Sequence, residues 1–136
     1  MNLTNNQKVT LPSGAELEMT LAPFPEGRRL YVAVTKALKS INLTANLEDA
    51  NALKDAFIEV STSKEVEDAI LTCLKRCTYN NERILNWDFF EDVNRREDYI
   101  PLCWEVAKFN LYPFMKVLFA RLSARFVQTG QNPKSK

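Results

Sequence analysis

Apolar and polar residues alternate along residues 8–21, on both sides of a short turn motif. Alternation with a period of two predicts strands with one buried face, because successive side chains of a strand point to opposite faces of a sheet. The motif is Leu11-Pro12-Ser13-Gly14, and the apolar positions are Val9, Leu11, Ala15, Leu17, Met19 and Leu21. We therefore expect a β-hairpin here, as the only sheet of the protein. Helices should cover its apolar face, since an isolated hairpin is only marginally stable.

Apolar side chains at helical spacing follow a break at Pro23-Phe24-Pro25-Glu26-Gly27. Spacing of i, i+3, i+4 and i+7 places side chains on one face of a helix. It predicts one helix with Leu30, Val34, Ala37, Leu38 and Ile41, a second with Ala50, Leu53, Phe57 and Val60, and a third with Val66, Ala69, Ile70, Cys73, Leu74 and Cys77. The third should begin with a capping box, in which Thr62 accepts a hydrogen bond from the amide of Glu65.

The second half of the chain predicts three more helices. A turn at residues 78–82 precedes a short helix that opens near Asp88. Asp98 is positioned to cap the next helix with its carboxylate. Pro113 should end or kink that helix, because proline lacks the backbone N–H that a helix interior needs. We expect a last helix over residues 114–126.

These patterns together predict a predominantly helical α+β fold, with an N-terminal β-hairpin followed by about five to six helices in one domain. The length of 136 residues fits one domain with a sizeable core. We divide the chain into a polar N-terminal segment (1–7), a helical domain with the hairpin (8–127) and a flexible polar and basic tail (128–136).

Charge is balanced overall but unevenly distributed. Lys and Arg number 18 against 17 Asp and Glu, a balance that argues against a nucleic-acid-binding protein. Residues 47–98 carry 7 basic and 13 acidic side chains, whereas residues 99–136 carry 6 and 1. This polarity permits head-to-tail contacts between copies, so we expect a homo-oligomer. The alternative is two solvated faces of one domain.

Neither a signal peptide nor a membrane span is predicted. Residues 1–7 are polar, and the charge-free run over residues 109–115 is too short to cross a bilayer. Three cysteines are an odd number, and such a set is not the disulfide framework of a secreted protein. We therefore place the protein in a reducing cytoplasm, with no membrane as partner.

The residues that most often carry catalysis or bind metals are scarce. Because there is no histidine, the commonest general base and metal ligand is missing. Cys73 and Cys77 would share a helical face, where we interpret them as small core residues instead of zinc ligands. No glycine-rich phosphate loop is present. The acidic pairs Glu91-Asp92 and Glu97-Asp98 suit capping and surface ion pairs. We expect no enzyme activity, no cofactor and no bound metal.

The predicted last helix is apolar around most of its circumference. Such a helix is either the centre of a core or contacts two surfaces at once, and the sequence leaves both alternatives open. Under the second, the candidate oligomer or partner interface comprises Phe114, Met115, Leu118, Phe119, Leu122, Arg121, Arg125 and Phe126.

Several short motifs occur in a set order along the chain. They are Leu11-Pro12-Ser13-Gly14, Ala22-Pro23-Phe24, Cys73-Leu74-Lys75-Arg76-Cys77-Thr78-Tyr79, Arg96-Glu97-Asp98-Tyr99-Ile100-Pro101, Glu105, Lys108, Asn110 and Pro113-Phe114-Met115-Lys116. This order resembles the tail assembly chaperone family of long-tailed bacteriophages and prophages. The resemblance runs from about Lys8 to Arg125, and residues 42–60 contribute nothing to it.

The resemblance implies a non-catalytic protein of the host cytoplasm that is absent from the mature virion. Its partners would be the tape-measure protein, which it keeps soluble, and the tail-tube protein, which it helps to recruit. Many family members are also made in a longer form by a programmed ribosomal frameshift. The codons for Asn132-Pro133-Lys134 can form a slippery run of three cytosines and four adenines.

Two other classes of function remain open from the sequence. The protein could be a structural head–tail connector or tail-completion subunit that stays in the virion. It could also be a host-directed helical adaptor that binds one cellular target.

Overall fold

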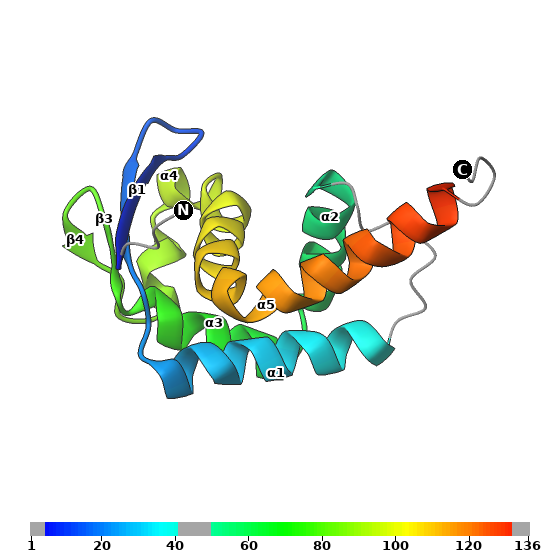
Figure 1. The fold of residues 1–136 in the computed structure, drawn as a ribbon. Coiled ribbons are helices and arrows are strands. Elements are labelled where there is room, and N and C mark those ends of the chain that lie inside the picture. The colour runs from blue at the N-terminus through cyan, green and yellow to red at the C-terminus, as the bar shows by residue number, and fades with distance from the viewer. Residues whose placement is uncertain (1–4, 41–49, 132–136) are drawn as a thin grey trace.

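The structure is a computed structural model, and it describes residues 5–40 and 50–131. Side chains are described for residues 5–38, 54–114 and 116. The strands are β1 (Asn6–Thr10), β2 (Glu16–Thr20), β3 (Cys77–Tyr79) and β4 (Glu82–Arg83). The helices are α1 (Phe24–Ser40), α2 (Ala50–Val60), α3 (Lys64–Leu74), the short 3-10 helix η1 (Trp87–Glu91), α4 (Val93–Arg96) and α5 (Tyr99–Gln131). Figure 1 shows their arrangement.

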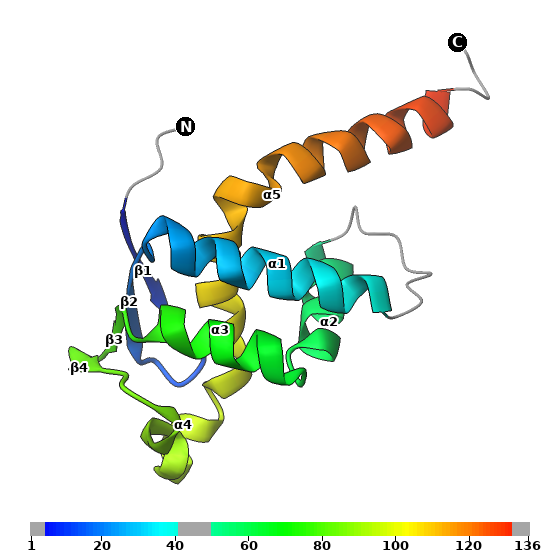
Figure 2. The ribbon, with the colours of Figure 1, turned by 90° about the horizontal axis from the view of Figure 1, so that it is seen from below.

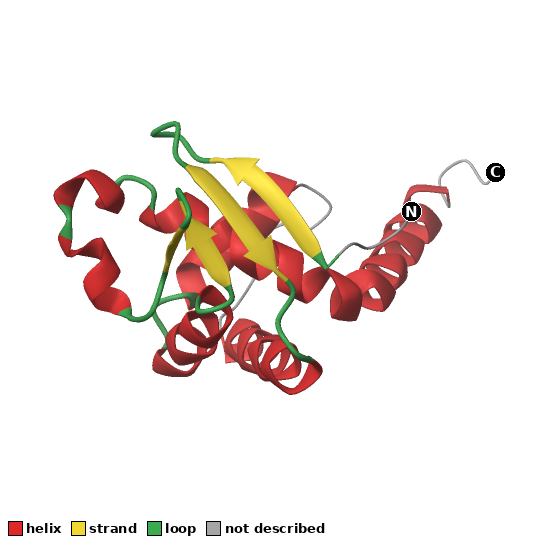
Figure 3. Ribbon diagram, turned by 90° about the vertical axis from the view of Figure 1, so that its left-hand side faces the viewer, coloured by secondary structure: helices red, strands yellow, loops and turns green. Residues whose placement is uncertain are grey.

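The sheet has four antiparallel strands in the order β1-β2-β3-β4. Leu17 of β2 pairs with Val9 on one side and with Tyr79 on the other. Figure 3 shows the strands as one layer in front of the helices. The mostly helical α+β fold and its N-terminal hairpin are confirmed. The expectation that the hairpin is the only sheet is wrong, since β3 and β4 extend it.

The turn predicted at residues 78–82 is the tip of a second hairpin. Asn80 (φ 50°) and Asn81 (φ 70°) form its two-residue loop between β3 and β4. Positive φ at both loop positions matches the twist of antiparallel strands, and asparagine tolerates this conformation. The Asn80 N–H donates to the Glu16 carbonyl (2.8 Å), and Asn80 Oδ1 accepts from the Glu16 N–H (2.9 Å). These bonds fix the loop to the end of β2.

The three helices predicted in the first half are confirmed, with changes at their ends. α1 begins at Phe24, inside the predicted break, because proline is tolerated in a first turn. The predicted capping box at the start of α3 is wrong. The residue before α3 is Ser63, whose side chain makes no capping hydrogen bond, and the Thr62 hydroxyl donates to the Glu59 carbonyl instead of accepting from Glu65. α3 ends at Leu74, so Cys77 lies in β3 and does not share a helical face with Cys73. Ile41, expected on α1, lies outside the described residues.

The second half contains two short helices and one long one. The side chain of Asn86 caps η1 by accepting a hydrogen bond from the Asp88 N–H. The side chain of Asp92 caps α4 by accepting one from the Asn94 N–H. α5 is a single helix of 33 residues that contains Pro113. Pro113 was predicted to end or to kink the helix, and it does not end it, so the separate last helix expected after it is wrong. The alternative of a kink agrees with Figures 1 and 2, in which the helix changes direction between its yellow and orange parts. It also extends to Gln131, past the predicted start of the tail.

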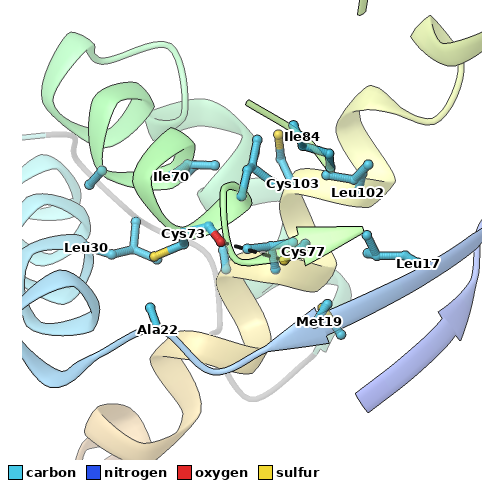
Figure 4. Packing of buried hydrophobic residues seen from close by; sticks show 14 of the residues in the cluster. Leu17, Met19, Ala22, Leu30, Ile70, Cys73, Cys77, Ile84, Leu102 and Cys103 are labelled. Atoms are coloured by element: carbon cyan, nitrogen blue, oxygen red, sulfur yellow. Dashed lines mark hydrogen bonds between the residues drawn. The ribbon is translucent and has the colours of Figure 1, made fainter. Parts of the chain in front are cut away.

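The core lies between the sheet and helices α1, α3 and α5. It includes side chains with no exposure at all, among them Leu17, Leu30, Leu74, Ile84 and Leu102. Figure 4 shows how side chains from the strands and the helices meet there. The alternation predicted for the hairpin is confirmed, because Leu11, Ala15, Leu17 and Met19 are buried, while Val9 and Leu21 are half-buried. Burial of these faces is the main source of stability in such a fold.

Candidate interaction surface

The first residue of the predicted interface, Phe114, is half-buried and packs against α1 of the same chain. Its ring stacks on Tyr31 with centroids 5.4 Å apart and lies against Phe24 at 5.8 Å. Phe24 and Tyr31 lie two turns apart on one face of α1, and Gly27 lies between them on the same face. Aromatic pairs at such distances stabilise beyond simple burial. Phe114 therefore anchors α5 to α1 just after Pro113.

The other seven predicted interface residues lie further along α5, where the backbone is helical to Gln131. They are Met115, Leu118, Phe119, Arg121, Leu122, Arg125 and Phe126. Figure 2 shows this orange and red part of α5 extending away from the sheet and from α3. Helical spacing places Met115, Leu118, Phe119, Leu122 and Phe126 on one stripe. Their side chains lie outside the described residues, so their role as an interface stays a prediction.

Asn110 fixes the base of α5 to the segment between β2 and α1. It is 2% exposed, its Oδ1 accepts from the Ala22 N–H (2.9 Å) and its Nδ2 donates to the Val106 carbonyl (2.9 Å). A buried amide that makes these bonds is satisfied, and losing one of its partners would be costly. Asn110 therefore joins two segments that are 88 residues apart in the sequence.

Asp98 is fully buried and joins the start of α5 to both hairpins. Its Oδ1 accepts from the Ser13 N–H (3.1 Å), while its Oδ2 accepts from the Tyr79 hydroxyl (2.8 Å) and from the Ser13 hydroxyl. Burial, and then the bond to Asp98, raise the pKa of Tyr79. A buried carboxylate needs such donors, because an unpaired charge is expensive to bury.

The predicted role of Asp98 as a side-chain cap is wrong. Its backbone carbonyl accepts from the Leu102 N–H, as expected just before a helix. Among the described residues, however, the donors to its carboxylate are Ser13 and Tyr79 and not the first amides of α5. The sequence indicates that Asn110 is unusual, because it follows Val106 by four residues and is therefore a polar residue on an otherwise apolar helix face. It contained no equivalent signal for Asp98, because a helix cap explains an aspartate at that position equally well.

The three cysteines lie in the core, as predicted for Cys73 and Cys77. Burial raises the pKa of the Cys73, Cys77 and Cys103 thiols to about 12. The Cys77 thiol donates to the Cys73 carbonyl at 3.6 Å, drawn as a dashed line in Figure 4. Buried protonated thiols are poor nucleophiles and poor metal ligands. Among the described residues, no three side chains form a group suited to holding a metal ion.

The acidic pairs expected at the surface are divided between surface and core. Glu91 and Asp92 are exposed, and they pair with Arg96 (3.2 Å) and Arg95 (3.9 Å) respectively. Glu97 is also exposed, but Asp98 next to it is buried. Within the described part of the chain, no helix combines the length and the apolar character needed to cross a bilayer.

Comparison with known proteins gives one result that spans most of the chain. The family model described as "Phage tail assembly chaperone protein, TAC" matches residues 17–123. No curated protein and no solved structure matches the chain. The matched span begins in β2 and ends within the outer part of α5, and it includes both Asp98 and Asn110.

Proposed function

Since the chain belongs to the phage tail assembly chaperone family, we propose that it binds the tape-measure protein and helps to recruit tail-tube subunits. The family resemblance seen in the sequence motifs is thereby confirmed. The family is non-catalytic and acts during assembly in the host, which also confirms that the chain is not an enzyme. The identity of the partners within the tail is the proposal.

The long outer part of α5 supports this proposal. Phe114 fixes its base to α1, and the remainder of the helix extends from the body (Figure 2). In the sequence of this part, apolar residues recur at the spacing of one helical stripe. A tape-measure protein is a long chain that exposes apolar stripes until the tail tube encloses it. Helices with an apolar stripe commonly bind such segments. Weak contacts repeated along the length would add up by avidity and still release when the tube assembles.

Co-expression with the tape-measure protein tests this interface. We expect Leu118→Glu or Phe119→Glu to abolish co-purification of the tape-measure protein, because each places a charge on the apolar stripe. Ala124→Glu is the matched control, since helical spacing places it on the side of the same helix opposite the stripe, and it should retain binding. Circular dichroism must show equal folding of all three variants. Equal binding by all three would contradict α5 as the interface.

We also propose that the chaperone leaves before the virion matures. Mass spectrometry of purified particles should then detect the tail-tube protein and not this chain. Detection of the chain at a stoichiometric level would instead favour a connector or tail-completion subunit. A phage in which this gene is deleted, yet assembles normal tails, would favour a host-directed adaptor.

A second, longer product is proposed as part of this mechanism. A minority of ribosomes would shift frame near residues 132–136 and append a domain that contacts the tape-measure protein. The domain over residues 8–127 would be shared by both products. The gene provides the check, because the proposal requires a slippery run at this position and an overlapping open frame downstream. Without these, the chain is made in one form only.

A further inference from the structure

Helices α1 and α3 lie side by side in opposite directions (Figure 2), and an ion pair joins them near each end. In the first turn of α1, Glu26 accepts two hydrogen bonds from Arg76, at 2.8 and 3.2 Å, just after the end of α3. Towards the other end of α1, Lys36 lies 3.7 Å from Glu65 in the first turn of α3. A surface groove runs along α1 between these two ion pairs.

The lining of this groove is partly apolar and partly basic, and its volume is about 310 Å³. We call it the α1 groove, and it is lined by Pro25, Arg28, Arg29, Val32, Ala33 and Lys36 of α1 and by Glu65 of α3. Val32 is 43% exposed, which is unusual because valine is among the residues most often buried. The groove therefore offers an apolar contact to a side chain from another molecule.

Two arginines of the α1 groove have no acidic partner among the described side chains. Arg28 and Arg29 are exposed, and no salt bridge between described residues includes either of them. Of the nearby acids, Glu26 is engaged by Arg76, and Glu65 lies beside Lys36. The lining thus contains three cations and one carboxylate. Its positive charge suits an acidic partner, because complementary charges guide association and fix its register.

The apolar part of the lining favours a protein partner over a nucleic acid. A phosphate backbone would use the arginines, but it would leave Val32 uncovered and would be repelled by Glu65. The net charge of +1 also gives the chain no general attraction for a polyanion. An amphipathic helix uses both parts of the lining, because its apolar stripe can cover Val32 while acidic residues beside the stripe face the arginines.

We propose that the α1 groove binds an acidic amphipathic helix of another protein. From Pro25 to Lys36 the groove follows α1 for about 16 Å, which corresponds to about three turns of a partner helix. The partner places an aliphatic side chain on Val32 and carboxylates against Arg28 and Arg29. Glu65 disfavours a further carboxylate near Lys36, so the acidic residues of the partner concentrate at the arginine end.

This surface differs from the one proposed for the tape-measure protein. Phe24 and Tyr31 contact Phe114 on one face of α1. Helical spacing places Arg29 and Val32 on a different face of the same helix. The α1 groove is therefore a second binding surface, in addition to the contact proposed for the outer part of α5.

Fluorescence anisotropy with the full chain tests the α1 groove. The probe is a fluorescein-labelled helical peptide of about 15 residues, long enough for three turns, with leucines at helical spacing and glutamates beside them. One reference peptide has glutamine in place of every glutamate, and another has alanine in place of every leucine. Both should bind more weakly, the first because it lacks charge and the second because Val32 loses its apolar contact.

The matched variants remove two exposed cations inside or outside the groove. We expect Arg28→Gln/Arg29→Gln to weaken binding of the acidic peptide at least about fivefold, since two charge pairs are lost. Lys8→Gln/Lys75→Gln should bind like the wild type, because neither lysine lines the groove. All four positions are exposed, so folding should be unchanged, as circular dichroism will verify.

Glu65→Gln should change binding in the opposite direction. It removes the carboxylate of the lining and releases Lys36, so we expect the acidic peptide to bind at least about twofold more tightly. The Glu65 side chain is 65% exposed, so the substitution should leave the fold intact. A purely structural role of the groove residues would not produce this gain.

Four results would each overturn the proposal. They are equal binding of the glutamate and glutamine peptides, an arginine variant that binds like the wild type, tighter binding of a single-stranded DNA of equal charge, and anisotropy that falls again at high chain concentration. The last would mean that copies of the chain occupy the groove. Leu118→Glu alters α5 and should leave peptide binding unchanged, so failure of the tape-measure contact and failure of the α1 groove are distinguishable.

Discussion

The ring of Phe114 fills the space that a side chain on Gly27 would need: a β-carbon there would lie 3.2 Å from Phe114 Cε2. Glycine is otherwise a poor choice inside a helix, where it costs about 1 kcal/mol relative to alanine. A glycine at position 27 of α1 is therefore explained by the close approach of Phe114. This contact holds α5 against α1 at the point where its outer part begins.

Substitution of Gly27 should act through Phe114. We expect Gly27→Leu to lower the free energy of unfolding by about 1–3 kcal/mol, as overpacking does in a tight contact. Gly27→Ala should be nearly neutral, because a small shift of the ring is offset by better helix propensity. Urea unfolding gives these values, and repeating Gly27→Leu in a Phe114→Ala background should reduce its effect. Simple additivity of the two substitutions would show that Phe114 is not the group displaced.

Replacing Asp98 should be among the most damaging changes outside the apolar core. Asp98→Ala leaves the hydroxyl of the buried Tyr79 without its acceptor and also removes the acceptor of both Ser13 bonds, for which we expect a loss of about 3 kcal/mol. Tyr79→Phe removes one bond to a charged group and should cost about 1.5–3 kcal/mol. Ser13→Ala should also destabilise, since its hydroxyl donates to the same carboxylate. Denaturant titration ranks the variants, and equal stability of Asp98→Ala and wild type would refute the network.

The buried thiols predict a loss of stability in alkali. Burial raises the pKa of Cys73, Cys77 and Cys103 from 9.0 to about 12. Between these values the unfolded thiols lose protons that the folded ones keep, so the unfolded state binds fewer protons. The free energy of unfolding therefore falls as pH rises from about 9 towards 12, by up to about 1.4 kcal/mol per pH unit for each thiol.

Chemical unfolding at pH 8, 9 and 10 measures this slope. Cys103→Ala should give a shallower slope than the wild type, even if it is less stable at pH 8, because one titrating thiol has been removed. Lys titration is common to both proteins and cancels in the comparison, and the raised pKa of Tyr99 comes first from burial, which Cys103→Ala leaves largely in place. Identical slopes would mean that Cys103 ionises equally well in the folded protein.

The loop of the second hairpin should accept glycine and reject a β-branched residue. Asn81 has a φ of 70°, so Asn81→Gly should change stability by less than about 0.5 kcal/mol, whereas Asn81→Val should cost about 1–2 kcal/mol. Asn80→Gly is the informative companion, since it keeps the backbone conformation but removes the bond from the Glu16 N–H. Thermal unfolding distinguishes the three, and tolerance of valine would argue against the left-handed loop.

Local patterns in the sequence predicted local structure well. The alternation around Leu17 and the helical spacing around Ile70 each identified a buried face, because burial imposes the period of the element on the sequence. Asn80-Asn81 predicts a turn, and the structure shows that this turn is the two-residue loop of a hairpin, a place that suits a pair of asparagines. The strands on either side, β3 and β4, have three and two residues, which are too few to show an alternation of apolar and polar positions.

Long-range relationships were the ones that sequence reasoning missed. Pro113 predicts either an end or a kink of the helix, and the local sequence does not decide between the two; packing of Phe114 on Tyr31 supports α5 beyond the proline, so the helix continues. Tertiary contacts can override a local helix breaker when they stabilise both sides of it. Asp98 was assigned to its own helix because its true partners, Ser13 and Tyr79, are distant in the sequence.

The bond between Asp98 and Ser13 also bears on how the chain folds during synthesis. These residues are 85 positions apart, so the first hairpin leaves the ribosome long before its acceptor is made. Contacts between distant segments form late and slow the final step of folding. The nascent chain should therefore remain open until α5 emerges, with the hairpin exposed to chaperones of the cell. Pulse-labelled nascent chains of increasing length should gain protease resistance only once Asp98 and Asn110 have cleared the exit tunnel.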